Sequence, residues 1–184
     1  EGDRPKRGDI VIFRYPLEPK IHYVKRNIGI SGDEILYTKE GLWVAFASDN
    51  PYTEDSSKTL IYKGKTYFYE PYAKKHPGIH YENIPFNAFV QLQSYLQSGH
   101  KIGMEPITLD NGELAFHTKI KEDEFFMMGD NRNNSNDSRF WGSVPYRYVV
   151  GKPWFIYLSW DSDFNIRWER IGETIESLET QKTP

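Results

Sequence analysis

Cysteine is absent from this sequence. Its absence excludes disulfide bonds, thiolate metal ligands and a cysteine nucleophile. The histidines offer no replacement: His76 and His80 have the spacing of two metal ligands on a helix, but Pro77 and Gly78 between them prevent that helix. We therefore expect neither a metal ion nor a cofactor.

Long apolar runs are also absent. No stretch of about 18 apolar residues occurs, and the N-terminus lacks the pattern of a signal peptide, so no part of the sequence is expected to cross a membrane. The sequence starts at Glu1 without a methionine, which favours a region excised from a longer protein. Its 184 residues are enough for one domain, or for a core with a smaller lobe.

An excess of positive charge is missing as well. The formal net charge is −3, and acidic and basic residues are interspersed without a clustered basic face, so nucleic acid is not an expected partner. Aromatic residues, by contrast, are plentiful. They make up 16% of the sequence, with 13 Tyr, 11 Phe and 5 Trp, and these residue types favour strands. Composition alone therefore predicts a mainly β fold.

One stretch, residues 124–145, changes character abruptly. It opens with Phe125–Met128, a short apolar run suited to a buried strand. The residues that follow, 129–139, are nearly all polar, before Phe140 and Trp141 restore the apolar character. A polar segment between apolar anchors is a common place for a functional site. A solvated turn has the same composition, and composition alone favours the turn.

The order of residues favours the functional site. From Met128 the chain reads Met-Gly-Asp-Asn-Arg-x-Asn-Ser-x-Asp-Ser-Arg-x-Trp-Gly-x-Val-Pro, which resembles the C-terminal signature of type I signal peptidases, the Ser/Lys enzymes that remove signal peptides from exported proteins. Two further segments match the same family. Residues 7–13 read Arg-Gly-Asp-Ile-Val-x-Phe, and residues 23–33 read Tyr-Val-Lys-Arg-x-Ile-Gly-x-x-Gly-Asp. The second departs from the family at Ser31, where proline is usual.

The resemblance implies roles for Lys25 and Ser135. By strand periodicity alone, Lys25 is expected to be an edge or surface residue. The matching family segment carries the general-base lysine, so the resemblance implies that Lys25 is the base and that Ser135 orients it through a hydrogen bond. The other residues implied to form or brace the site are Tyr23, Gly129, Asp130, Asn131, Arg132, Asp137 and Arg139.

A lysine accepts a proton only in its neutral form. Its pKa, about 10.4 in water, must therefore fall by several units, and burial away from carboxylates has this effect. We accordingly expect that Asp130 and Asp137 do not contact the ammonium group of Lys25. Instead, Asp137 and Arg139 are expected to form a bidentate ion pair with each other.

The nucleophile is not found in this sequence. In the family it lies in a Ser-Met-x-Pro segment, after the membrane anchor and well before the Arg-Gly-Asp strand. Here no serine is followed by methionine, and six residues precede Arg7. The chain is therefore expected to be a truncated, catalytically inactive peptidase domain.

For the fold, the resemblance implies an antiparallel β-sheet catalytic core with an inserted, β-rich cap lobe that contains one short helix. We assign residues 1–35 and 119–184 to the core, and residues 36–118 to the cap lobe. Strands are expected at residues 10–13, 21–33 with a turn at 31–33, 35–37, 42–46, 61–62, 66–69 and 164–171. A pair of strands, broken at residues 151–153, is expected within 148–160.

The single predicted helix covers residues 85–98. It has Pro85 in its first turn, and Gly99 supplies the stop. Its predicted apolar stripe consists of Phe86, Phe89, Val90 and Leu96.

The leading hypothesis is thus a membrane-bound serine endopeptidase that cleaves preproteins after small residues. Its implied partners are the signal peptides of secreted preproteins, bound extended beside a strand, and the membrane lipid surface, against which exposed aromatic residues lie. Its implied location is the cytoplasmic membrane, with one or a few N-terminal spans and the catalytic domain on the extracytoplasmic side. Two alternatives stay open: a non-catalytic extracytoplasmic binding module with the same fold, and a self-cleaving repressor of the same Ser/Lys group.

Overall fold

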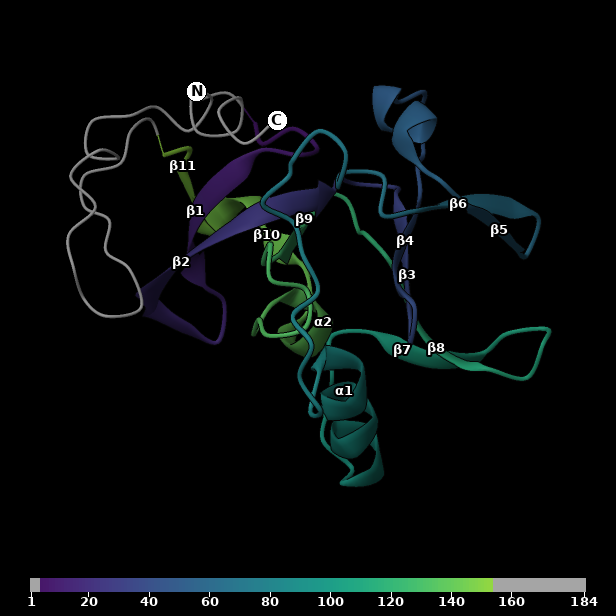
Figure 1. Cartoon of the computed structure of the whole chain (residues 1–184). Helices are drawn as coiled ribbons and strands as arrows, with labels where there is room; N and C mark the ends of the chain where they lie inside the picture. The colour runs from purple at the N-terminus through teal and green to yellow at the C-terminus, as the bar shows by residue number, and fades with distance from the viewer. Residues whose placement is uncertain (1–3, 154–184) are drawn as a thin grey trace.

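Two antiparallel sheets form the framework of the chain (Figure 1). The computed structural model describes residues 4–153, so the strand predicted at 164–171 and most of the pair predicted within 148–160 lie outside the described residues. One sheet has five strands in the order β10-β9-β2-β1-β11, and the other has six in the order β5-β6-β4-β3-β8-β7. The mainly β prediction is confirmed.

The five-stranded sheet joins segments that are far apart in the sequence. The hairpin of β1 (Ile10–Tyr15) and β2 (Glu18–Gly29) comes from the N-terminal part of the chain, whereas β9 (Glu124–Met128) pairs with β2 from almost a hundred residues later. The short strands β10 (Val144–Pro145) and β11 (Val149–Gly151) form its edges. All three segments that resemble the peptidase family therefore lie on or beside one sheet.

The six-stranded sheet is built from the residues between β2 and β9. Its strands are β3 (Glu34–Thr38), β4 (Gly41–Ala45), β5 (Thr59–Tyr62), β6 (Lys65–Tyr69), β7 (Glu105–Thr108) and β8 (Leu114–Lys119). The predicted borders of the cap lobe, after residues 35 and 118, fall inside β3 and β8. The division into a core and an inserted lobe stays a prediction.

A shared hydrophobic cluster connects the two sheets. Ile28 and Phe126 of the first sheet pack in the same cluster as Ile35 and Phe116 of the second, and all four side chains are fully buried. Full burial of a side chain of this size contributes about 1.5–3 kcal/mol. The cluster packs β9, a strand of the five-stranded sheet, against the six-stranded sheet. It thereby holds the segment that follows β9.

Strand β9 is buried on both faces. Phe126 and Met128 point into the cluster between the sheets, whereas Phe125 and Met127 belong to a second cluster on the other side of the five-stranded sheet, with Val11 among its members. A strand covered on both sides reads as a continuous apolar run rather than an alternating one. This explains why the four residues before the polar segment are all apolar.

The predicted helix begins later than expected. Helix α1 covers Ala88–Gln97, because Asn87 caps it by accepting hydrogen bonds from the amides of Phe89 and Val90. The prediction from Pro85 was wrong by three residues at this end. The helix ends as predicted: Ser98 is its C-cap, and Gly99 follows with a φ of 73°.

The predicted apolar stripe of the helix was also wrong in part. Phe86 and Leu96 are exposed by 55% and 37%, whereas the buried residues of α1 are Ala88 and Leu92. Phe89 packs against the cluster between the sheets, as expected of a stripe residue.

Three short helices complete the described part of the chain. A 3₁₀ helix, η1 (Pro51–Asp55), forms in the segment between β4 and β5, and η2 (Tyr146–Tyr148) precedes β11. Between β9 and β10 lies α2 (Ser138–Trp141), which starts within the signature segment. Over residues 4–153, no helix is long and apolar enough to cross a bilayer.

Candidate active site

Strand pairing brings Lys25 to the segment that follows β9. Lys25 lies near the end of β2, where its neighbour Arg26 pairs with Met128, the last residue of β9. The chain after Met128 then turns back toward the sheet, and the Nζ atom of Lys25 donates a hydrogen bond of 2.9 Å to the hydroxyl of Ser135. The two residues that the sequence predicts to act together are thus in direct contact.

Lys25 is half-buried, and its surroundings lower its pKa below the ordinary value. Burial is the main cause. The negative charge of Asp137 acts in the opposite direction, the positive charge of Arg139 adds to the lowering, and Asp130 opposes it. The ring of Tyr23 also faces the ammonium group, with 5.6 Å from Nζ to the ring centroid. Such a lysine loses its proton more readily than a lysine in water.

The two carboxylates near Lys25 are both paired with arginines. Asp130 accepts two hydrogen bonds of 2.8 Å from Arg26, and Asp137 accepts bonds of 2.8 and 2.7 Å from Arg139. Within residues 4–153, neither carboxylate forms an ion pair with Lys25. The expectation of a lysine without a carboxylate partner, and that of a bidentate Asp137–Arg139 pair, agree with these contacts.

The Asp137–Arg139 pair lies wholly inside the molecule. Both side chains are 0% exposed. Asp137 also accepts a hydrogen bond from the amide of Gly129, while Arg139 donates one of 2.6 Å to the carbonyl of Arg132 and lies 4.7 Å from the ring of Tyr37. Burial acts to lower the pKa of Arg139, but the charge and hydrogen bonds of Asp137 raise it above the usual value, so this arginine stays charged. The pair connects both ends of the polar segment.

Pairing with Arg26 keeps Asp130 charged, just as pairing with Asp137 keeps Arg139 charged. Burial acts to raise the pKa of Asp130, but the hydrogen bonds and charge of Arg26 outweigh it, and the pKa lies below the ordinary value. Arg26 itself donates a further hydrogen bond to the carbonyl of Gly8 and lies 3.0 Å from Nδ1 of His76. Asp130 therefore stays ionised and ties the polar segment to β2.

Gly129 occupies a place where no side chain fits. A Cβ atom on Gly129 would lie 2.2 Å from the hydroxyl oxygen of Ser135, 2.6 Å from its Cβ, and 3.5 Å from Nζ of Lys25. Glycine, which has no side chain, lets the backbone approach closely here. The close approach is to the serine that contacts Lys25.

We expect that Gly129→Ala displaces Ser135 from Lys25. The new methyl group overlaps the serine side chain, and a shift of about 1 Å at a reacting group can cost about a hundred-fold in rate. The measurement is the rate of preprotein cleavage, together with the melting temperature. Gly151→Ala is the matched control, because within residues 4–153 no atom beyond its two chain neighbours lies within 4 Å of a Cβ placed there. Equal rates for the two variants contradict the prediction.

The remaining predicted residues hold the polar segment from its other side. The side chain of Asn131 donates a hydrogen bond of 2.8 Å to the carboxylate of Glu82. Arg132 is fully buried and donates a bond of 3.3 Å to the carbonyl of Gly129. Arg132 holds the backbone of the segment, whereas Asn131 connects the segment to Glu82, and within residues 4–153 neither side chain forms a hydrogen bond with Lys25.

Several residues at the site had no role assigned from the sequence. Arg26 belongs to a matching motif, so the sequence marked its position, but its pairing with Asp130 was not predicted. Ser138 accepts a hydrogen bond from the amide of Met127, and it too lay in the signature. Glu70, His76 and Glu82 come from the middle of the chain. No motif singled out Glu70 or Glu82, and His76 was considered only as a metal ligand, so only the fold places these three residues beside the signature.

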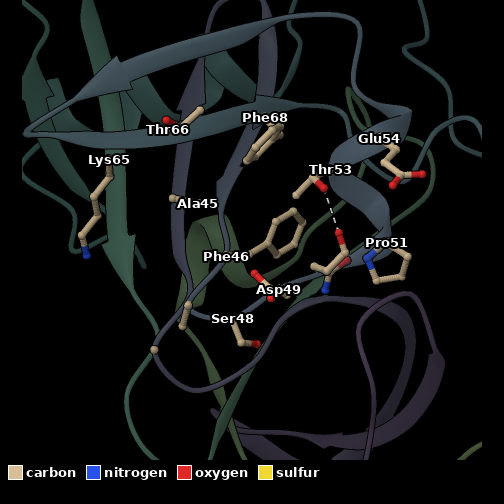
Figure 2. Close-up of a pocket in the computed structure, with 13 residues that line it drawn as sticks. Ala45, Phe46, Ser48, Asp49, Pro51, Thr53, Glu54, Lys65, Thr66 and Phe68 are labelled. Carbon is tan, nitrogen blue, oxygen red and sulfur yellow. Dashed lines mark hydrogen bonds between the residues drawn. The ribbon is translucent and has the colours of Figure 1, made fainter.

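A separate cavity lies on the six-stranded sheet, away from Lys25. Its volume is about 870 Å³, and its lining comes from residues in and around β4, η1 and β6. Figure 2 shows Phe46 and Phe68 on one wall and Thr53 and Glu54 of η1 on the other. None of the predicted site residues lines it, so this cavity is distinct from the candidate active site.

Comparison with known proteins gives the class of this chain. Residues 1–160 match the model of the family described as "Signal peptidase, peptidase S26". The match covers most of the chain, and the chain therefore belongs to this family of signal peptidases. The resemblance found in the sequence is confirmed.

Individual relatives carry a more specific name. A protein named signal peptidase I from Helicobacter pylori is 43% identical over 206 aligned positions, which cover 97% of this chain and 69% of that protein. Signal peptidase I from Pseudomonas aeruginosa is 33% identical over 169 positions, covering 86% of this chain and 51% of its own length. A crystal structure of a signal peptidase I from Enterococcus faecalis aligns with a TM-score of 0.41 at 21% identity, over 83% of this chain and 99% of that one.

Proposed function

We propose that the chain is the peptidase domain of a signal peptidase I, a serine endopeptidase that removes N-terminal signal peptides from exported preproteins after small residues. The observation that carries the proposal is the hydrogen bond from Lys25 to Ser135, in a setting where burial lowers the pKa of the lysine and both nearby carboxylates are paired with arginines. A general base that works near neutral pH requires these conditions.

In the proposed mechanism, Lys25 is the general base. The neutral amine takes the proton of the nucleophilic serine as its oxygen attacks the carbonyl carbon of the scissile bond. The resulting ammonium group then gives this proton to the leaving amine, which breaks the peptide bond. Ser135 keeps the amine of Lys25 oriented, and the two arginine–carboxylate pairs, of which Asp137–Arg139 is fully buried, keep Ser135 in place.

The nucleophile of the proposed reaction belongs to a Ser-Met-x-Pro segment. No serine among these 184 residues has that context. Assays of cleavage therefore use a chain in which this segment precedes Glu1, and assays of structure and binding use the chain as given.

The edge of β2 offers a place for an extended substrate. Residues 22–25 of β2 pair with β1 on one side, whereas β9 pairs with β2 only from Arg26 onward. In the described part of the chain no strand covers the other edge of residues 22–25, and Val24 is 55% exposed beside Lys25. We propose that the signal peptide adds to this edge as a strand, which presents its backbone to Lys25.

The test is the cleavage of a preprotein that has alanine before the scissile bond. A matched preprotein carries a bulky residue there and keeps the rest of the signal peptide. Cleavage of the alanine form alone supports the proposal. Binding of both forms without cleavage by the chain that carries the serine segment contradicts it and favours a binding module.

We also propose that the β1–β2 hairpin contacts a membrane surface on the extracytoplasmic side. Three apolar side chains of this hairpin are exposed: Leu17 by 70%, Ile21 by 40% and Val24 by 55%. They lie on the same hairpin as Lys25, so contact with the bilayer places the base near the point where a signal peptide leaves the membrane. Exposed large apolar side chains favour such a contact.

The double variant Leu17→Asp/Ile21→Asp is expected to bind lipid vesicles about ten-fold more weakly, or worse, since two apolar contacts are replaced by charges. Vesicle co-sedimentation of the chain as given measures this affinity. Ile61→Asp is the control, because Ile61 is 72% exposed on β5, in the other sheet. Equal weakening by the control variant shows that the hairpin has no special role.

A further inference from the structure

One segment of the six-stranded lobe lies directly against the signature segment. The amide of His80 donates a hydrogen bond of 2.9 Å to the carbonyl of Asp130, and the amide of Arg132 donates one of 2.8 Å to the carbonyl of His80. Farther along, the amide of Ala88 donates to the carbonyl of Asn133. The two segments are thus joined through their backbones over several residues.

Glu82 adds side-chain contacts to this backbone pairing. Its carboxylate accepts hydrogen bonds of 2.8 Å from Asn131 and 3.3 Å from Asn134, and its carbonyl accepts one of 2.7 Å from Asn133. These contacts lie at the surface. They hold the residues just before Ser135.

The buried contact between the lobe and the signature is an ion pair. Glu70 is 7% exposed, and its carboxylate faces the guanidinium of Arg132, which is 0% exposed, at 3.4 and 3.5 Å. The hydroxyl of Tyr81 donates a further hydrogen bond to the same carboxylate. A buried arginine needs a buried negative charge close to it, and Glu70 supplies that charge.

The backbone of Glu70 adopts an unfavourable conformation. Its φ is 37°, in the left-handed region that glycine enters without strain and that other residues rarely adopt. Strain of this kind persists where the surrounding structure holds the residue in place, and it gathers at functional sites. Here the strained residue is the one whose carboxylate reaches Arg132.

Arg132 connects Glu70 to the residues around Lys25. Its guanidinium donates to the carbonyl of Gly129, and its own carbonyl accepts a hydrogen bond from Arg139. Gly129 is in turn packed against Ser135, which contacts Lys25. A continuous set of contacts therefore leads from Glu70 to the hydrogen bond between Ser135 and Lys25.

We propose that Glu70 is a positioning residue of the peptidase: its carboxylate fixes Arg132, and so keeps Ser135 within hydrogen-bond reach of Lys25. According to this proposal, the inserted lobe contributes to catalysis because its residue Glu70 positions Ser135. The catalytic meaning of the inference rests on the proposed function, whereas the mechanical link between Glu70 and the segment of residues 129–135 is independent of it.

The test compares Glu70→Gln with Glu34→Gln. Glu34 is the matched control: its side chain is 12% exposed, it lies in β3 of the six-stranded sheet, and it contacts the cationic Lys65 and the hydroxyl of Tyr67, as Glu70 contacts Arg132 and Tyr81. In the described part of the chain, Glu34 forms no hydrogen bond or ion pair with residues 129–139. Both variants lose one buried negative charge, and only one of them loses a contact with the signature segment.

Two measurements on the chain as given separate positioning from stability. Amide hydrogen exchange of residues 129–135 is expected to accelerate about ten-fold or more in Glu70→Gln and to stay unchanged in Glu34→Gln, at conditions where both variants are folded. An NMR titration of the Lys25 side chain is expected to show its pKa moving up, toward that of an exposed lysine, in Glu70→Gln alone. The cause is water reaching the amine when Ser135 shifts.

A kinetic measurement on the chain that carries the serine segment completes the test. Glu70→Gln is expected to lower kcat by about ten- to a hundred-fold with little change in KM, because the substrate edge of β2 is untouched. Glu82→Gln provides a second variant at an exposed position that carries no risk to folding, and a smaller change of the same kind is expected from it.

The outcomes distinguish the inference from the proposed function. Equal effects of Glu70→Gln and Glu34→Gln on exchange and titration overturn the inference and leave a purely structural ion pair. A titration of Lys25 at the value of an exposed lysine in the unaltered chain overturns the proposed function, while the exchange of residues 129–135 still decides whether Glu70 holds that segment.

Discussion

Replacing Lys25 with alanine is expected to lower kcat/KM for preprotein cleavage by about 10⁴-fold or more. Within residues 4–153, the two carboxylates near Lys25, Asp130 and Asp137, are already paired with arginines, so neither is a good substitute for the base. The measurement is made on the chain that carries the Ser-Met-x-Pro segment. Ser135→Ala is expected to have a milder effect, about a hundred-fold, because it removes the orienting hydrogen bond and leaves the amine.

The pH dependence of cleavage follows from the direction of the lysine shift. The active form of Lys25 is the neutral amine, so the rate rises with pH as the ammonium group loses its proton. Because burial lowers the pKa of Lys25, this rise occurs at a lower pH than it does for a lysine in water. Full activity of Lys25→Ala, or a rate that falls as pH rises through this range, contradicts the mechanism and assigns the base to another group.

Asp137→Ala is expected to destabilise the chain by about 3–5 kcal/mol. The substitution leaves the fully buried Arg139 without its carboxylate, and an unpaired buried charge has a cost of this size. It also removes the hydrogen bond from the amide of Gly129 and the cap of α2. The free energy of unfolding, measured by urea denaturation of the chain as given, tests this expectation.

The control for Asp137→Ala is Glu113→Ala. Glu113 also pairs with a basic residue, Lys39, but both side chains are largely exposed, and surface pairs of this kind contribute little. We expect no measurable change in stability from the control. A loss for Asp137→Ala as small as that of the control shows that the pair is not needed to hold the segment.

Much of the site could be predicted because its chemistry lies in short motifs. Lys25 and Ser135 were identified from two such motifs, and the structure brings them together because β2 and β9 pair. The Asp137–Arg139 pair could be predicted for a different reason. The two residues are two positions apart, so their contact depends only on local geometry.

The contacts between the signature segment and the residues between β2 and β9 could not be predicted. Glu70 lies 62 residues from Arg132, and nothing in its neighbourhood distinguishes it from the other acidic residues of an acidic chain. Its role follows only from the packing of one sheet against the other. The start of α1 was missed because two helix signals were close together: Pro85 is compatible with a first turn, but the side chain of Asn87 makes the capping hydrogen bonds.

The large sequence separation between Lys25 and Ser135 has a consequence for when the active site forms during folding. The two residues are 110 positions apart, and their contact depends on the pairing of β9 with β2 across all the residues between them. Contacts of such high sequence separation form late in folding, since the intervening chain must first be ordered. In a nascent or partly folded chain, Lys25 therefore lacks its contact with Ser135. We expect the peptidase to become active only when β9 has paired with β2.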